Sequence, residues 1–147
     1  IVDLPEESWS SQSNSVREGV NALHGKLDAV LVVPSDMPLL GGQDYIDLIG
    51  AFKTRGEGIS MVRPVVCQQP GNPVVFDYSI VDLSNELNDP MCRSWWEQHP
   101  RECLSWHTDN SRYIVDLDTA EDVAEVQKRL GKRLRMPSNK EAPSGVA

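Results

Sequence analysis

The sequence has few of the features that identify several large classes of protein. Its three cysteines, Cys67, Cys92 and Cys103, are odd in number and form no Cys-x-x-Cys pair, so we expect reduced thiols and no disulfide framework. No apolar run approaches the roughly 18 residues that a membrane-spanning helix needs. Because no targeting pattern is present either, the sequence predicts a cytoplasmic protein without a membrane partner.

Basic residues and histidines are also scarce. The chain has 14 Lys and Arg residues against 22 Asp and Glu residues, and its formal charge of −8 argues against a nucleic-acid partner. The 3 histidines lack the spacing of zinc ligands, and neither a nucleophile elbow nor a Ser-His-Asp order is present. What the chain offers for chemistry is therefore mainly its carboxylates.

The apolar pattern alternates between strands and helices along the chain. Strands are predicted near residues 29–33, 59–66, 73–76, 103–107 and 112–116. Helices are predicted from Ser15 to Gly25, around 45–52, at 78–87, at 90–99 and after a capping box formed by Thr119 and Asp122. This alternation is typical of an α/β three-layer sandwich with a mostly parallel sheet. We expect one domain over residues 1–132 and a disordered polar tail at 133–147.

The most informative segment is the turn from Pro34 to Leu39, which directly follows the aliphatic run Ala29–Val33. In open α/β sheets, ligands bind just beyond the carboxyl ends of the strands, so Asp36 would stand where a metal or a polyphosphate binds. The alternative is that Asp36 only forms an Asx-turn after the strand. The residues alone leave both interpretations open.

A second acidic cluster, Asp116–Asp118, follows another apolar segment near the end of the domain. Mg²⁺ is typically held by one or two carboxylates together with substrate phosphates, so Asp36 and Asp118 could share one ion. Alternatively, Asp118 only stabilises the start of the next helix through the helix dipole. Asp116 ranks below Asp118, because the two would point to opposite faces if the strand continued through them.

Two further segments are candidate substrate contacts. In Pro70-Gly71-Asn72-Pro73, Gly71 would let a ligand approach the backbone closely, although an ordinary hairpin turn is the alternative. Ser13 and Ser15 lie at a predicted helix start, where free N–H groups suit an anion, and plain N-capping is the alternative there.

Taken together and in order, these segments resemble the molybdenum cofactor cytidylyltransferases, a group of nucleotidyltransferases that make dinucleotide forms of molybdopterin. The resemblance covers roughly residues 9–130 and rests on four motifs: Ser13–Val20, Ser35–Leu39, Pro70–Phe76 and Ile114–Asp122. It implies a Rossmann-like three-layer α/β/α sandwich.

The resemblance also implies a reaction, in which a molybdopterin phosphate attacks the α-phosphorus of CTP and pyrophosphate leaves. Asp36 and Asp118 would be the catalytic carboxylates that bind Mg²⁺, and no covalent protein intermediate is needed. The implied substrate contacts are Ser13, Ser15, Pro70, Gly71, Asn72 and Pro73. A molybdoenzyme that receives the product is a further implied partner.

The sequence departs from the family pattern in two ways. Asn72 stands where the family usually has His, and because Asn cannot titrate, the acceptor could instead be a sugar phosphate or another small molecule. A non-catalytic module that hands cofactor to a molybdoenzyme is the alternative outside enzymes.

The second departure is that the strand and Gly-rich loop that open the family fold, and that read the base, have no counterpart here. We therefore expect the C-terminal portion of a longer transferase. On its own it would not turn over CTP, and it would self-associate through an exposed sheet edge.

Overall fold

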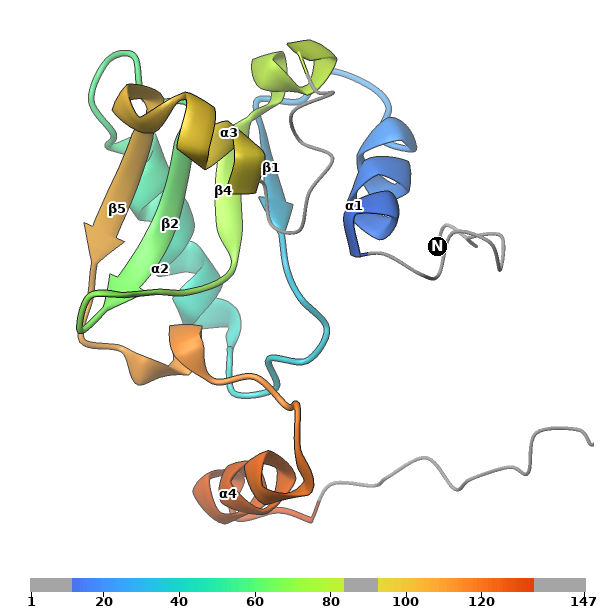
Figure 1. The fold of residues 1–147 in the computed structure, drawn as a ribbon, viewed down its shortest axis with the longest axis vertical. Helices are drawn as coiled ribbons and strands as arrows, with labels where there is room; N and C mark the ends of the chain where they lie inside the picture. Colours follow the sequence, from blue (N-terminus) through green and yellow to red (C-terminus); the bar gives the residue numbers. More distant parts are fainter. Residues whose placement is uncertain (1–11, 84–92, 134–147) are drawn as a thin grey trace, which may run out of the picture.

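The computed structural model describes residues 12–83 and 93–133, and its elements alternate between strands and helices as expected. Figure 1 shows a central sheet with helices on either side of it. Parts of the two helices predicted at 78–87 and 90–99, and nearly all of the predicted tail, lie outside the described residues. What is described of those two helices is a 3-10 helix, η2 (Tyr78–Leu83), and a short α-helix, α3 (Arg93–Gln98).

The sheet has five strands, which run in the spatial order β1-β4-β2-β3 with β5 beside β2. Strands β2 and β5 pair in parallel, whereas β4 is antiparallel to both β1 and β2, so β1, β2 and β5 share one direction. The α/β class is thus confirmed, and β4 is the strand that runs against the common direction. The strands span Ala29–Val32 (β1), Met61–Val66 (β2), Gln69–Pro70 (β3), Val74–Asp77 (β4) and Cys103–His107 (β5).

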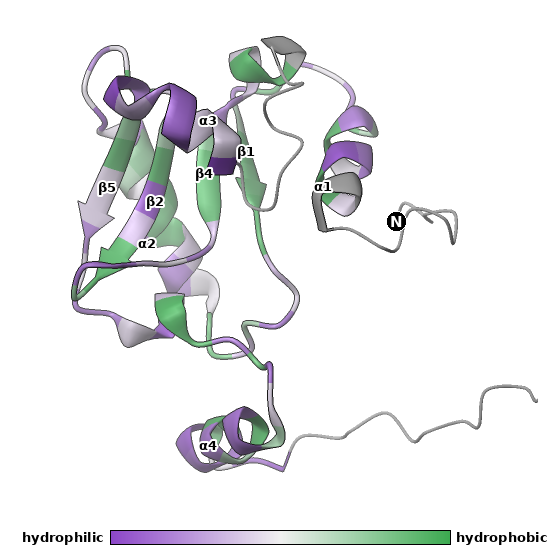
Figure 2. Ribbon diagram, viewed as in Figure 1, coloured by the Kyte–Doolittle hydropathy of each residue, from purple (hydrophilic) through white to green (hydrophobic). Residues whose placement is uncertain are grey.

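Helices cover both faces of the sheet. The side chains of each strand alternate between these two faces, so each strand contributes to the packing on both sides. Met61 and Phe76 pack toward Val20 of α1 (Gln12–Asn21) and Trp95 of α3. Their neighbours Val62 and Val75 belong to a second cluster, which includes Leu48 and Phe52 of α2 (Gly42–Lys53). In Figure 2, β1 and β4 are coloured as hydrophobic, whereas α1 and α3 are mostly hydrophilic. The result is the predicted three-layer sandwich.

The C-terminal part differs from the prediction in one respect and agrees in another. Residues 112–116 form no strand, because Tyr113 lies in a 3-10 helix, η5 (Ser111–Ile114), with its side chain buried in the core. The capping box of α4 (Ala120–Leu130) is confirmed, with Thr119 and Asp122 bonded reciprocally. In Figure 1, α4 lies beyond the end of the sheet toward which β1 and β2 point.

The N-terminal helix also begins earlier than its sequence suggests. α1 starts at Gln12, so Ser15 lies inside the helix and is not its N-cap. The helix is followed by a turn that contains Gly25 in a left-handed conformation, with φ 104°. No helix in the described part of the chain is both long and apolar enough to cross a membrane.

The packing of α2 against the sheet can be tested directly by mutation. We expect Leu48→Ala to lower the free energy of unfolding by about 3 kcal/mol, because the Leu48 side chain is fully buried and its removal leaves a cavity. Ile46→Ala on the same helix removes a side chain that is 62% exposed and should change stability by less than about 0.5 kcal/mol. Urea unfolding followed by circular dichroism measures both. Equal effects would show that α2 does not pack as described.

Candidate functional site

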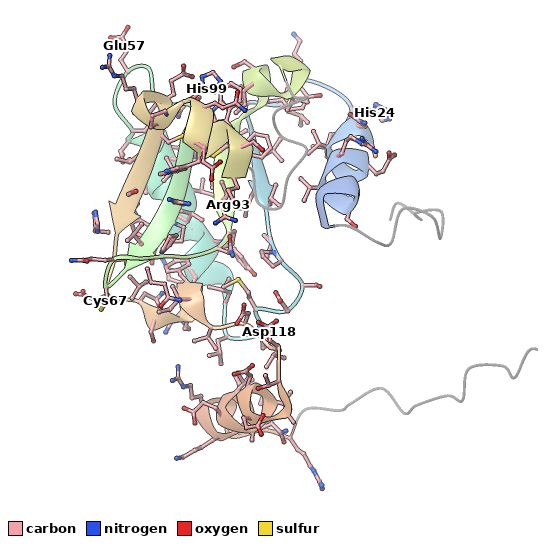
Figure 3. All side chains as sticks on the ribbon, in the orientation of Figure 1. His24, Glu57, Cys67, Arg93, His99 and Asp118 are labelled. Atoms are coloured by element: carbon pink, nitrogen blue, oxygen red, sulfur yellow. The ribbon has the colours of Figure 1, made fainter. Side chains whose placement is uncertain are left out.

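Three carboxylates meet at the end of the sheet where β1 terminates. Asp36 lies in the turn after β1, whereas Asp116 and Asp118 lie in the segment between η5 and α4. One carboxylate oxygen from each of the three lies within 4.8 Å of the others. Figure 3 labels Asp118 at this place, between the end of the sheet and α4. The position agrees with the rule that ligands of α/β sheets bind beyond the carboxyl ends of strands.

A backbone hydrogen bond holds the two acidic segments together. The N–H of Leu117 donates to the carbonyl oxygen of Asp36 at 2.9 Å. Because Leu117 lies between Asp116 and Asp118, this bond brings both carboxylates to Asp36. The lower rank given to Asp116 assumed a strand through residues 112–116, and the structure has no strand there. In an irregular segment, alternate residues need not point to opposite faces.

The electrostatics of the cluster favour a cation. Oδ1 of Asp36 is buried and has no hydrogen-bond partner among the described residues. The negative charge of Asp116, followed by desolvation and the charge of Asp36, raises the pKa of Asp118. A positive ion would relieve this repulsion and give the buried oxygen a partner. Carboxylate oxygens are the ligands that Mg²⁺ prefers, so the residues present fit that ion.

The Pro70–Pro73 segment closes the other side of the site. The turn between β2 and β3 is made by Cys67 and Gln68, both with positive φ, so Pro70–Pro73 is not a hairpin turn and instead joins β3 to β4. The N–H of Gly71 donates to the carbonyl oxygen of Pro64 at 2.8 Å, and that of Asn72 donates to the carbonyl oxygen of Tyr113 at 2.9 Å. The segment is thereby attached to the chain that carries Asp116 and Asp118.

Gly71 is required by this close contact. A Cβ atom at position 71 would lie 2.5 Å from the carbonyl oxygen of Tyr113, and that neighbour is backbone and cannot rotate away. The bare backbone of Gly71 therefore lets the two segments touch. The close approach that the sequence suggested for a ligand is made here by the protein itself.

The two segments and Asp36 enclose a cavity of about 300 Å³. Its wall combines the acidic cluster with residues of the Pro70–Pro73 segment. The cavity is lined by Pro34, Asp36, Met37, Gln69, Pro70, Gly71, Asn72, Tyr113, Ile114, Asp116 and Asp118. The structure thus brings together Asp36, Asp118, Pro70, Gly71 and Asn72 from the sequence prediction. Pro73 is fully buried behind the cavity and does not line it.

The predicted serines lie elsewhere. Ser15 lines a separate, largely apolar cavity of about 590 Å³ between α1 and β1. Ser13 lies in the first turn of α1, and its side chain is outside the described part of the structure. Tyr113 and Gln69, which sequence reasoning missed, do line the carboxylate cavity. A tyrosine next to an acidic cluster has no pattern of its own that would have revealed this.

The layered sheet, with acidic groups and a glycine-containing loop beyond its strand ends, defines an α/β domain with a candidate ligand site at the carboxyl ends of its strands. The chain belongs to the family of MobA-like NTP transferase domains, whose model matches residues 2–103. This membership confirms the resemblance at the level of the superfamily and supports nucleotidyl transfer in general.

A solved structure with a similar fold is the 4-diphosphocytidyl-2C-methyl-D-erythritol synthase of Anaerococcus prevotii. The TM-score is 0.62 at 16% sequence identity, and the match covers 84% of this chain and 68% of the other. At this identity the match supports the fold. A search of curated proteins finds no significant match to the sequence.

The contact at Gly71 leads to a prediction. We expect Gly71→Ala to destabilise the fold by about 2 kcal/mol, because the added methyl group forces the loop away from Tyr113. It should also speed hydrogen exchange at the Asn72 amide, whose bond to Tyr113 would lengthen. Gly19→Ala is the control, since a Cβ there meets nothing within 4 Å and Ala is the better helix former. An Asn72 amide as protected in the variant as in the wild type would contradict the contact.

The acidic cluster leads to a second prediction. Because Asp116 is the largest cause of the raised pKa of Asp118, we expect Asp116→Asn to lower the pKa of Asp118 toward its ordinary value. Carbon-detected NMR titration of the carboxyl groups measures this shift. Glu121→Gln removes an exposed carboxylate close in sequence that does not contribute to the shift, and it should leave the pKa of Asp118 unchanged. Equal shifts in the two variants would argue against a close Asp116–Asp118 pair.

Proposed function

We propose that this domain transfers a cytidylyl group from CTP to molybdopterin with release of pyrophosphate, in the cytoplasm, before the product passes to a molybdoenzyme. The observation that carries the proposal is the meeting of the acidic cluster and the Pro70–Asn72 loop at one cavity beyond the end of β1. Family membership supports the nucleoside triphosphate as donor. The four ordered motifs support the molybdopterin acceptor.

Mg²⁺ would be held by Asp36 and Asp118, with Asp116 as a third carboxylate at hand. When bound, such an ion neutralises charge on the phosphates and orients them for in-line displacement. The chain's own contribution is to hold its carboxylates close together despite their repulsion, at one end of the cavity. Because positioning dominates phosphoryl-type transfer, no nucleophilic side chain is needed.

The Pro70–Asn72 loop would bind the acceptor on the other side of the cavity. The backbone N–H groups of Gly71 and Asn72 are already used within the protein, and Asn72 carries the polar side chain of this loop, so we expect that side chain to recognise a ligand. Its amide both donates and accepts hydrogen bonds but carries no charge at any pH. Pro73 is fully buried and does not line the cavity, while substrate contacts at Ser13 and Ser15 remain predictions.

A second candidate is a nucleotidyltransferase for a sugar phosphate or another small molecule. Asn72 favours this second candidate, because the family usually has His at this position and Asn has no titratable group. The carboxylate cluster would serve either acceptor. The two candidates would differ only in the acceptor that the Pro70–Asn72 loop binds.

The experiment is pyrophosphate release from CTP, ATP and GTP with Mg²⁺, using molybdopterin and a panel of sugar phosphates as acceptors. It should use both this 147-residue chain and the protein made from its complete coding sequence. We expect activity with CTP and molybdopterin in the complete protein and a loss of roughly 100-fold or more in Asp36→Asn, because the variant removes a charge at the reacting phosphates. Asp28→Asn, an exposed Asp at the opposite end of β1, should retain activity.

Each other outcome has a definite meaning. Activity with a sugar phosphate alone would favour the second candidate. Full activity of Asp36→Asn would exclude a catalytic role for the carboxylate cluster. Unchanged biological function in that variant, with no pyrophosphate released by any protein, would indicate a non-catalytic module.

A further inference from the structure

Asp44 is buried, with 2% of its surface exposed, in a chain whose other described carboxylates are more accessible. It lies in the first turn of α2, and its carboxylate accepts four hydrogen bonds. The donors are the backbone N–H of Gly41 at 2.9 Å, Nδ2 of Asn110 at 2.7 Å, and Nε and Nη2 of Arg112 at 3.0 and 2.7 Å. These bonds, above all those from Arg112, lower the pKa of Asp44 to about 2.

The bonds of Asp44 connect the two halves of the carboxylate site. Gly41 ends the loop that carries Asp36, whereas Asn110 and Arg112 begin the segment that carries Asp116 and Asp118. The carbonyl oxygen of Asp44 also accepts the hydroxyl of Tyr113 at 2.6 Å. Tyr113 in turn accepts the N–H of Asn72. One residue thus contacts the chain on each side of the cavity.

The position of these bonds indicates a role in addition to stability. The pair does stabilise the fold, because Asp44 is buried and its bonds to Arg112 are charge-assisted, although the Arg112 side chain itself is 50% exposed. What a bidentate Arg–carboxylate pair supplies is geometry, since two parallel bonds fix both distance and direction. Here that geometry is imposed on the segment that leads directly to Asp116 and Asp118.

We propose that Asp44 is a positioning residue of the site, which orients residues 110–118 so that Asp116 and Asp118 face Asp36. The inference rests on the proposed function, because it assumes that the cluster binds a divalent cation. Asp44 does not line the carboxylate cavity. Its effect passes through Arg112 and Tyr113 to the hydrogen bond between Leu117 and Asp36.

The test is Mn²⁺ binding to the 147-residue chain, measured by electron paramagnetic resonance. We expect Asp44→Asn to weaken Mn²⁺ binding by about 10-fold to 100-fold, as loss of an outer contact does at metal sites. Arg112→Lys keeps the positive charge but loses the paired bonds, so it should weaken binding in the same direction and less strongly. Because the Arg112 side chain is half exposed, this variant remains informative even if Asp44→Asn does not fold.

Asp77 and Arg55 provide a matched control. Their ion pair is 3.1 Å long and half-buried, Asp77 also accepts a backbone N–H, and neither residue lines the carboxylate cavity. Asp77→Asn and Arg55→Lys should therefore change stability in urea while leaving Mn²⁺ affinity unchanged. If they weaken Mn²⁺ binding as much as the Asp44 and Arg112 variants do, general loosening explains the effect and the inference is wrong.

The same experiment separates this inference from the proposed function. Asp36→Asn should abolish tight Mn²⁺ binding. If the wild-type chain binds no Mn²⁺, or if Asp36→Asn binds it equally well, the metal site itself fails. If Asp36→Asn loses binding while Asp44→Asn and Arg112→Lys keep wild-type affinity, the site stands and the positioning role of Asp44 is excluded.

Discussion

The site depends on holding three carboxylates together against their mutual repulsion. The negative charge of Asp116, followed by desolvation and the charge of Asp36, raises the pKa of Asp118. What opposes this repulsion is a small set of hydrogen bonds, from Leu117 to Asp36, from Asn72 to Tyr113 and from Arg112 to Asp44. About 80 residues of the sequence separate Asp36 from Asp116, so it is these hydrogen bonds, and not nearness in the sequence, that hold the two acidic segments together.

The hydrogen bonds, and not the hydrophobic core, hold the carboxylates together because of where the site lies. The two core clusters occupy the faces of the sheet, and their side chains come from alternate residues of the same strands. The cavity lies beyond the strand ends, where the chain is irregular and its backbone groups need individual partners. Gly71 lets two such irregular segments touch without a side chain between them. The sheet therefore sets the approximate position of the acidic groups, and polar contacts set their final distances.

The sequence predicted those parts of the site that depend on local patterns. The position of Asp36 after an aliphatic run and the capping box of Thr119 both follow from a few adjacent residues, whereas the contact that Gly71 makes with Tyr113 does not. The face of Asp116 was mispredicted, because the assignment assumed a strand where Tyr113 instead turns into the core. The antiparallel course of β4 and the bonds of Asp44 depend on partners distant in the sequence. An Asp in the first turn of a helix normally indicates only a favourable interaction with the dipole, so Asp44 gave no signal of its own.

The same separation of core and site explains why fold alone does not select the acceptor. Side chains of the Pro70–Asn72 loop that face the cavity contribute nothing to the core clusters, so Asn72 can replace another residue without disturbing the sheet. The backbone of the loop is different, because its N–H groups and the missing side chain of Gly71 attach it to the acidic segment. Under the proposed function, acceptor recognition would therefore change at the Asn72 side chain alone, whereas the distance between loop and carboxylates is set by the backbone. The proposed nucleotidyl transfer would require a fixed metal position and could use different acceptors, and a fixed loop backbone with a replaceable side chain is compatible with both.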